Sequence, residues 1–234
     1  MRTRYVLEIS VESIEAARAA ERGGAQRIEF CSNAREGGTT PSDELLLAVR
    51  ESVSLPILSM VRPRGGNFLY SEEEFELMQR AIDAAREFRM DGVVLGLLDA
   101  NGGIDVEGTK RLVDCAMPMP VTFHRAFDAF AGDLRVALED VIQTGATRLL
   151  TSGGKPTAPE SLDLLGELVR IAGERLIVMP GSGLHAGNIR EAVAKTGARE
   201  FHAGLSSVAS SVAGDLGTFE AEVRRMAGAL RDCD

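Results

Sequence analysis

Residues 23–31, GGAQRIEFC, contain the unit that decides the fold of this chain. The second glycine follows a helical pattern, and Arg27 opens a short apolar run that is typical of a buried strand. The same order of glycine and arginine recurs in TGATR at 144–148 and in TGARE at 196–200. Glycine readily adopts the left-handed conformation that ends many helices. The chain is therefore predicted to repeat one type of helix-to-strand connection.

Strand-like apolar runs occur eight times, and their first residues lie 22 to 35 positions apart. This spacing fits one strand, one helix and two short loops, which is the repeating unit of a parallel sheet. The runs are YVLEI at 5–9, RIEFC at 27–31, ILSMV at 57–61, GVVLG at 92–96, VTFHR at 121–125, TRLLT at 147–151, RLIVM at 175–179 and REFHA at 199–203.

Eight such units predict an α/β fold, a (β/α)8 TIM barrel that forms a single domain over residues 1–234. A helix at 215–230 is expected to close it. The alternative is an open doubly wound sheet. The turn after the first run, EISVES at 8–13, lacks the GxGxxG pattern of dinucleotide-binding sheets. The barrel is therefore favoured, and no organic cofactor is expected.

Three helix starts are expected from capping patterns. SEEE at 71–74 and TAPE at 157–160 both have the serine or threonine and the glutamate of a capping box. In TTPSDELLLAVR, Thr40 is expected to cap a helix whose first residue is Pro41.

The composition is that of an ordinary soluble globular protein. The formal net charge of −9 makes a broad nucleic-acid interface unfavourable, because phosphate backbones require a basic surface. No apolar stretch is long enough to span a membrane. The three cysteines, at 31, 115 and 233, are few and widely spaced, which favours a reducing compartment. A cytoplasmic location is expected.

Ionisable residues gather where the predicted strands end, the position of catalytic groups in barrels. Side chains alternate along a strand, so each apolar neighbour that faces the helices turns an ionisable residue toward the barrel axis. The inward residues are Glu8, Glu29, His124 and His202, and Asp128 follows the fifth strand. Any one of them could belong to a structural ion pair, but four strands together indicate a site. These five residues are the predicted catalytic group.

A second group of residues predicts binding of an anion. Arg62, Arg64 and Arg125 offer donors that suit carboxylates and phosphates, although each could instead pair with the many acidic residues. Two glycine-rich turns follow the sixth and seventh strands, and exposed N–H groups in such turns bind anions. Their predicted anion-binding residues are Ser152, Gly153, Gly154, Gly181, Ser182 and Gly183.

A metal ion could bind in either of two ways. Glu8, Glu29, His124 and His202 could form a mixed nitrogen and oxygen site for a divalent ion such as zinc or manganese. Cys31 could bind Cu(I), which prefers thiolates, although a lone cysteine is more often a small buried apolar residue.

The chain closely resembles the CutC copper homeostasis family over about residues 5 to 205. The resemblance rests on these segments in order: LEIS, GGAQRIEFCSN, EGGTTPS, VRPRGGNFLYSEEEF, GVVLG, VTFHRAFD, LLTSGG, MPGSG and EFHAG. It implies a cytoplasmic TIM barrel that forms homo-oligomers and is linked to copper. This chain departs from the family pattern at three positions: Ser10 replaces a cysteine, Leu58 a histidine and Asn67 an aspartate.

Two functional hypotheses follow. In the first, the protein binds a copper ion in copper homeostasis, with Cys31 as the metal ligand. In the second, it is a lyase, isomerase or hydrolase that acts on a small anionic, possibly phosphorylated, metabolite. Glu29 and His124 would then be the acid/base pair, supported by Glu8 and His202. A non-catalytic oligomeric scaffold is a third interpretation.

Overall fold

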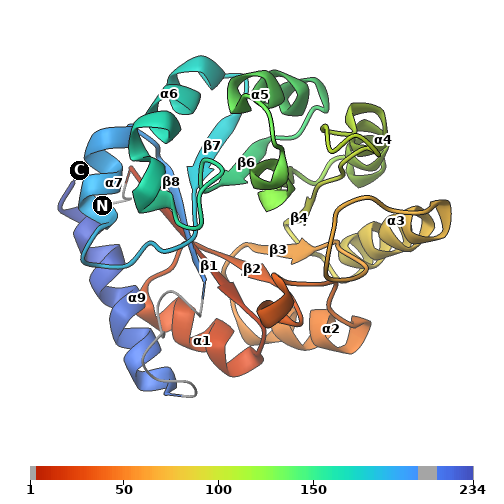
Figure 1. The fold of residues 1–234 in the computed structure, drawn as a ribbon. Coiled ribbons are helices and arrows are strands. Elements are labelled where there is room, and N and C mark those ends of the chain that lie inside the picture. The colour runs from red at the N-terminus through yellow and green to blue at the C-terminus, as the bar shows by residue number, and fades with distance from the viewer. Residues whose placement is uncertain (1–3, 205–214, 234) are drawn as a thin grey trace.

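The computed structural model describes residues 4–204 and 215–233 and contains the eight parallel strands that the sequence predicts (Figure 1). They pair in the order β7-β6-β5-β4-β3-β2-β1-β8, and a single parallel bridge between Gly181 and His202 joins β7 to β8. The predicted TIM barrel is therefore confirmed. The strands are β1 (Val6–Val11), β2 (Arg27–Phe30), β3 (Ile57–Met60), β4 (Gly92–Leu95), β5 (Val121–Phe123), β6 (Arg148–Thr151), β7 (Ile177–Pro180) and β8 (Glu200–Gly204).

Helices surround the strands (Figure 1). The α-helices are α1 (Ile14–Gly23), α2 (Asp43–Ser52), α3 (Glu72–Glu87), α4 (Val106–Ala116), α5 (Leu134–Gln143), α6 (Leu162–Ala172), α7 (Ile189–Thr196) and α9 (Leu216–Arg231). Short 3-10 turns are η1 (Ala34–Glu36), η2 (Arg125–Ala129) and η3 (Ala158–Ser161). The predicted closing helix is α9, which packs against α1 so closely that a Cβ at Gly23 would lie 2.7 Å from Val223. No described helix is long and apolar enough to cross a membrane.

The repeated helix-to-strand connection has the predicted geometry. Gly24, Gly145 and Gly197 follow α1, α5 and α7 and have φ angles of 95°, 81° and 66°. These left-handed angles favour glycine, which lacks the Cβ that would clash. The recurring glycine in the sequence therefore indicates a left-handed backbone conformation at each of these three connections.

Two of the three predicted helix starts are confirmed. The Ser71–Glu74 and Thr157–Glu160 capping boxes are both present, the second at the start of η3. The prediction for Thr40 is wrong, because α2 begins at Asp43 and Ser42 caps it by accepting a hydrogen bond from Leu45 N–H. The backbone of Thr40 is instead held by Arg62, since the Thr40 N–H donates to the Arg62 carbonyl over 2.9 Å.

The lower half of the barrel interior, near the start of the strands, holds a buried ionic network that the sequence interpretation missed. Arg27 donates to Glu8 and to Glu200, and Arg148 Nε donates to Glu200 over 2.6 Å. We call these four residues the lower layer. The recurring strand-start arginines at 27 and 148 thus point inward, whereas Arg199 of the third repeat is exposed. Each buried charge in this layer has an opposite charge beside it, which offsets its cost of desolvation.

Candidate functional site

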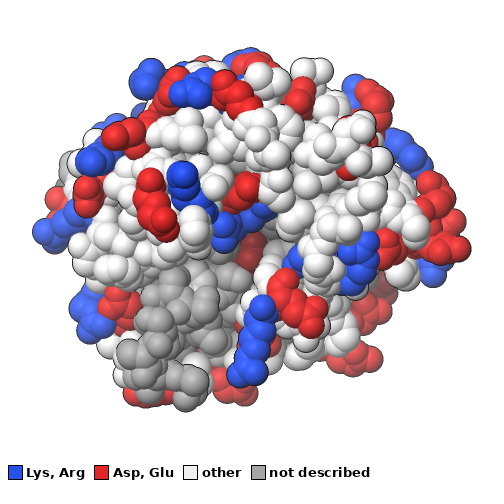
Figure 2. All heavy atoms as spheres, in the orientation of Figure 1, with Lys and Arg blue, Asp and Glu red and all other residues white. Residues whose placement is uncertain are grey.

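A cavity of about 430 Å³ opens at the C-terminal ends of the strands. Figure 2 shows basic and acidic side chains around a hollow in this face of the molecule. Eight of the residues predicted as a site line the cavity: Glu29, Cys31, Arg62, His124, Arg125, Ser182, Gly183 and His202. Four of these, Glu29, Cys31, His124 and His202, were expected from the alternation of side chains along the strands. Ser10, Met60 and Phe68 also line it and were missed. An inward position at the end of β3 could have indicated Met60, but Phe68 lies in a loop without such a signal.

His202 is held from behind by Glu8. Its Nδ1 lies 2.7 Å from Glu8 Oε1, and Glu8 is fully buried and also accepts from Arg27. Burial alone would raise the pKa of Glu8, but the Arg27 charge and the His202 hydrogen bond lower it to about 2. Glu8 therefore stays ionised and orients the imidazole from outside the cavity lining.

Glu29 is a buried carboxylate on the cavity wall with only one oxygen hydrogen-bonded. Its Oε1 accepts from Ser10 Oγ over 2.9 Å, whereas its Oε2 is buried without a hydrogen-bond partner. Burial raises the pKa of Glu29; the neighbouring His202 opposes the shift and Glu8 adds to it. Glu8, Glu29 and His202 bring ligand atoms within 4.8 Å of one another, so this trio could hold a metal ion. His124 is not part of this group, so only three of the four residues predicted to hold a divalent ion lie close enough together.

Cys31 lines the cavity as a thiol. Its Sγ lies 3.7 Å from Ser10 Oγ, and burial together with the charge of Glu29 raises its pKa to about 12. Cys31 packs in a small buried cluster with Leu58, Met60 and Val94. The position where the family pattern often has histidine, Leu58, is therefore apolar here. Sulfur ligands near the cavity come from Cys31 and from the thioether of Met60.

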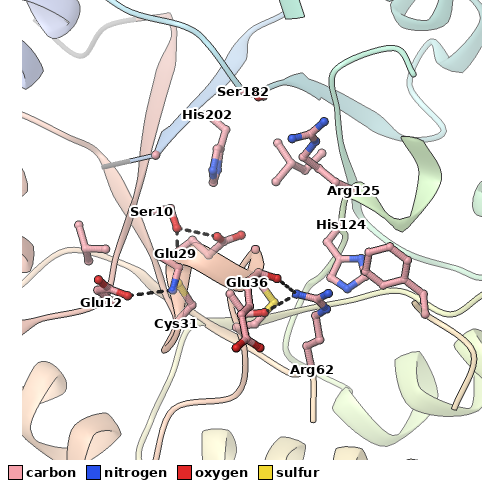
Figure 3. Close-up of a pocket in the computed structure, with 18 of the residues that line it drawn as sticks. Ser10, Glu12, Glu29, Cys31, Glu36, Arg62, His124, Arg125, Ser182 and His202 are labelled. Atoms are coloured by element: carbon pink, nitrogen blue, oxygen red, sulfur yellow. Dashed lines mark hydrogen bonds between the residues drawn. The ribbon is translucent and has the colours of Figure 1, made fainter. Parts of the chain in front are cut away.

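His124 and Arg62 meet on one side of the cavity (Figure 3). His124 Nδ1 accepts from Ala126 N–H over 3.3 Å, and its Nε2 is buried without a partner. Burial and the Arg62 charge lower the pKa of His124 to about 3, so the ring is neutral near pH 7. Since Nδ1 accepts, the single ring proton sits on Nε2, which has no acceptor among the described residues. His124 is thus arranged as a hydrogen-bond donor, and the predicted acid/base role is not what this geometry favours.

The Asp128 carboxylate accepts hydrogen bonds from backbone N–H groups of the turn after β6. Ser152 N–H and Gly154 N–H donate to the Asp128 carboxylate over distances of 3.0 to 3.1 Å. Arg125 Nε donates to the same carboxylate over 2.7 Å. The turn therefore does bind a carboxylate, as its glycine-rich pattern predicts, but the carboxylate belongs to the protein. Asp128 and residues 152–154 do not line the cavity, so the structure does not bring these predicted catalytic and anion-binding residues to the site.

The remaining predicted residues lie in two loops: Arg64 in the loop after β3, and Gly181, Ser182 and Gly183 in the loop after β7. Arg64 pairs with Glu74 through its Nε and donates to the Leu69 carbonyl over 2.7 Å, so it holds the loop after β3 together and lies outside the cavity. Gly181 lies behind the cavity beside the His202 side chain, whereas Ser182 and Gly183 line it. The serine-rich segment that follows β8 lies outside the described residues.

Comparison with known proteins agrees with this arrangement. The sequence profile of the CutC family matches residues 5–207. A family protein CutC of Chromobacterium violaceum is 50% identical over 198 residues, which cover 85% of this chain and 80% of the relative. The copper homeostasis protein cutC homolog of Homo sapiens is 45% identical over 207 residues, 88% of this chain and 76% of the relative.

Among solved structures, a CutC crystal structure from Streptococcus agalactiae matches with a TM-score of 0.80 and 30% identity. The match covers 85% of this chain and 98% of that chain. Sequence and fold comparisons thus select the same family. The chain belongs to the CutC family.

Proposed function

We propose that this protein acts in copper homeostasis and binds Cu(I) in the strand-end cavity through Cys31 and His202. The observation that carries the proposal is that a thiol and an imidazole line the same cavity. Thiolate and thioether sulfur suit Cu(I), and imidazole also binds copper. Support also comes from two relatives, of Homo sapiens and Mus musculus, that are named copper homeostasis protein cutC homolog.

The environment of His202 supports a ligand role. A histidine that binds a metal commonly donates its other ring N–H to a carboxylate, which fixes the tautomer. His202 Nδ1 is bonded to Glu8 in this way, which directs Nε2 toward the cavity. The Met60 thioether is the candidate for a second sulfur ligand, because Met60 lies beside Cys31: its methyl carbon Cε and Cys31 Sγ both lie within 3.3 Å of where a Cβ at Gly38 would be.

Anaerobic titration with Cu(I) against a competing chelator tests this proposal. We expect one Cu(I) per chain, loss of tight binding in Cys31→Ser and binding weaker by about tenfold or more in His202→Ala. Cys115→Ser is the matched control, since Cys115 lies in α4 outside the cavity lining and should leave affinity unchanged. Unchanged affinity in Cys31→Ser contradicts the proposal, as does selective binding of Zn²⁺ or Mn²⁺ through the Glu8, Glu29 and His202 trio.

A cytoplasmic location and homo-oligomeric assembly belong to the same proposal. The cysteines at 31, 115 and 233 are all free, which supports a reducing compartment. Fractionation of cells and sedimentation of the purified protein test the location and the assembly, respectively.

A second candidate function is proton-transfer catalysis on a small anionic metabolite. The unpartnered Glu29 Oε2 favours it, because a buried carboxyl with a raised pKa suits a general acid near neutral pH. Deuterium uptake from D2O into small keto acids, followed by NMR, tests for such chemistry. Glu29→Gln should abolish any uptake, and uptake that persists in this variant excludes Glu29 as the acid.

A further inference from the structure

We infer that the cavity binds a small organic carboxylate whose oxygens accept hydrogen bonds from Arg62 Nε and His124 Nε2. This inference deepens the second candidate function by naming the class of anion and the groups that hold it. It claims binding only, so its test needs no turnover and no copper. Failure of catalysis and failure of binding can therefore be told apart.

The charge of Arg62 is the first argument. The side chain is 4% exposed, and its two terminal nitrogens donate to the carbonyls of Glu36, Gly38 and Gly66 over 2.8 to 3.0 Å. Its Nε has no partner within hydrogen-bond distance, and no ion pair joins Arg62 to a described residue, although the Tyr70 hydroxyl interacts with the guanidinium. A buried guanidinium without an anion is costly, so the arrangement is complete only with a negative charge beside it.

The unpaired polar atoms of the residues that line the cavity are the second argument. Of the six buried side-chain atoms without partners in the described chain, three belong to residues on the wall of this cavity: Glu29 Oε2, Arg62 Nε and His124 Nε2. Buried polar groups are rarely left unpaired in folded proteins. Two of the three are N–H donors, so the ligand must present acceptors to that side.

Phe68 makes the donor pair a defined site. Its ring lies 4.9 Å from the Arg62 guanidinium carbon and 5.0 Å from the His124 ring. The aromatic ring therefore packs beside both side chains and makes their surroundings less polar. Hydrogen bonds to an anion are stronger in such a low-dielectric setting.

A carboxylate fits these donors better than a phosphate. One uncompensated guanidinium calls for one negative charge, and the two oxygens of a carboxylate match the two N–H groups. A doubly charged phosphate would bring its second charge close to Glu29 and Glu36, which line the same cavity. The volume of about 430 Å³ leaves room for a small metabolite attached to that carboxylate.

Ligand-observed NMR on the copper-free protein tests the inference. The probes are acetate, pyruvate and benzoate, each compared with its neutral amide, and inorganic phosphate. We expect at least one carboxylate to bind and its amide not to bind. His124→Phe removes the donor but keeps an aromatic ring, and Arg62→Lys keeps the charge but removes Nε. Each change should weaken binding by about tenfold or more, as expected for a hydrogen bond to a charged group.

Arg64→Ala is the matched control, because Arg64 belongs to the same RPRGG segment but lies outside the cavity. It should leave carboxylate binding unchanged. Arg62 also holds three loop carbonyls, so Arg62→Lys is interpreted only if its circular dichroism matches that of the parent protein. If the circular dichroism of Arg62→Lys differs from that of the parent protein, His124→Phe alone tests the inference. Equal binding of acid and amide, binding of phosphate alone, or unchanged binding by folded His124→Phe would overturn the inference.

Discussion

The lower layer of the barrel interior and the cavity above it are built from the same kinds of side chain, yet they differ in how these are paired. Arg27, Glu8, Glu200 and Arg148 all have charged partners within the layer. One pleat higher, the side chains that face the cavity include three with unpaired polar atoms, on Glu29, Arg62 and His124. Paired groups specify the fold, and unpaired groups indicate where a ligand completes the structure.

Glu8 connects the two regions. It lies opposite Arg27 on β2 and opposite His202 on β8, and it is bonded to both side chains. The lower layer thus fixes the orientation of a histidine in the cavity. One carboxylate therefore couples the ion pairs of the lower layer to the orientation of His202 in the cavity.

Breaking the lower layer should have the largest effect. Glu200→Gln keeps the size of the side chain but leaves Arg27 and Arg148 without that charge partner, which should cost about 3–5 kcal/mol of unfolding free energy. Urea unfolding measures it. Glu76→Ala removes the exposed i,i+4 pair with Arg80 and should cost only about 0.5 kcal/mol. Similar small costs for both variants would mean that the layer is not a stabilising network.

The neutral His124 predicts a pH effect of intermediate size. Its folded pKa of about 3 lies below the ordinary histidine pKa of 6.5, so the unfolded chain takes up the proton first as pH falls. Its contribution to stability is present above the unfolded pKa and is lost as pH falls toward the folded pKa. Between pH 7 and pH 5 this loss should be about 2 kcal/mol.

His124→Phe cannot take up this proton, so its stability should fall less over the same pH interval. Urea unfolding of both proteins at the two pH values makes the comparison. Identical pH dependence in the two proteins would show that His124 is not held neutral by the fold.

Glu29→Met sharpens the comparison because it should raise the unfolding free energy, whereas Glu200→Gln should lower it. The change removes a buried oxygen without a partner and fills the same space with an apolar chain. We expect the unfolding free energy to rise by about 1 kcal/mol, as is common when a functional group is replaced for stability. Thermal and urea unfolding measure it, and a loss of stability would place Glu29 with the paired groups.

The sequence predicted the fold because its signals are local. Glycine at the three repeated helix-to-strand connections and alternation within the strands depend on neighbouring residues. These signals located the strands and the inward positions of Glu8, Glu29, His124 and His202. Pairing across loops is different. Asp128 accepts hydrogen bonds from the turn at 152–154, and Arg64 pairs with Glu74. These contacts join separate segments, and a local sequence pattern does not show which segments lie close together. The sequence could therefore list candidate donors but could not tell which ones the protein itself occupies.

The smallest expected change in stability comes from Ser10→Cys, which restores the residue of the family pattern. Ser10 is partly buried and close in size to cysteine, so the unfolding free energy should change by less than about 0.5 kcal/mol. Its Oγ lies 3.7 Å from Cys31 Sγ, so the new thiol would stand beside the existing one. Two thiolates suit Cu(I) better than one, and affinity should rise by about tenfold or more. Chelator competition measures this rise. An unchanged affinity would mean that the cavity does not use Cys31 to hold copper, and the unpaired groups would then serve an anion alone.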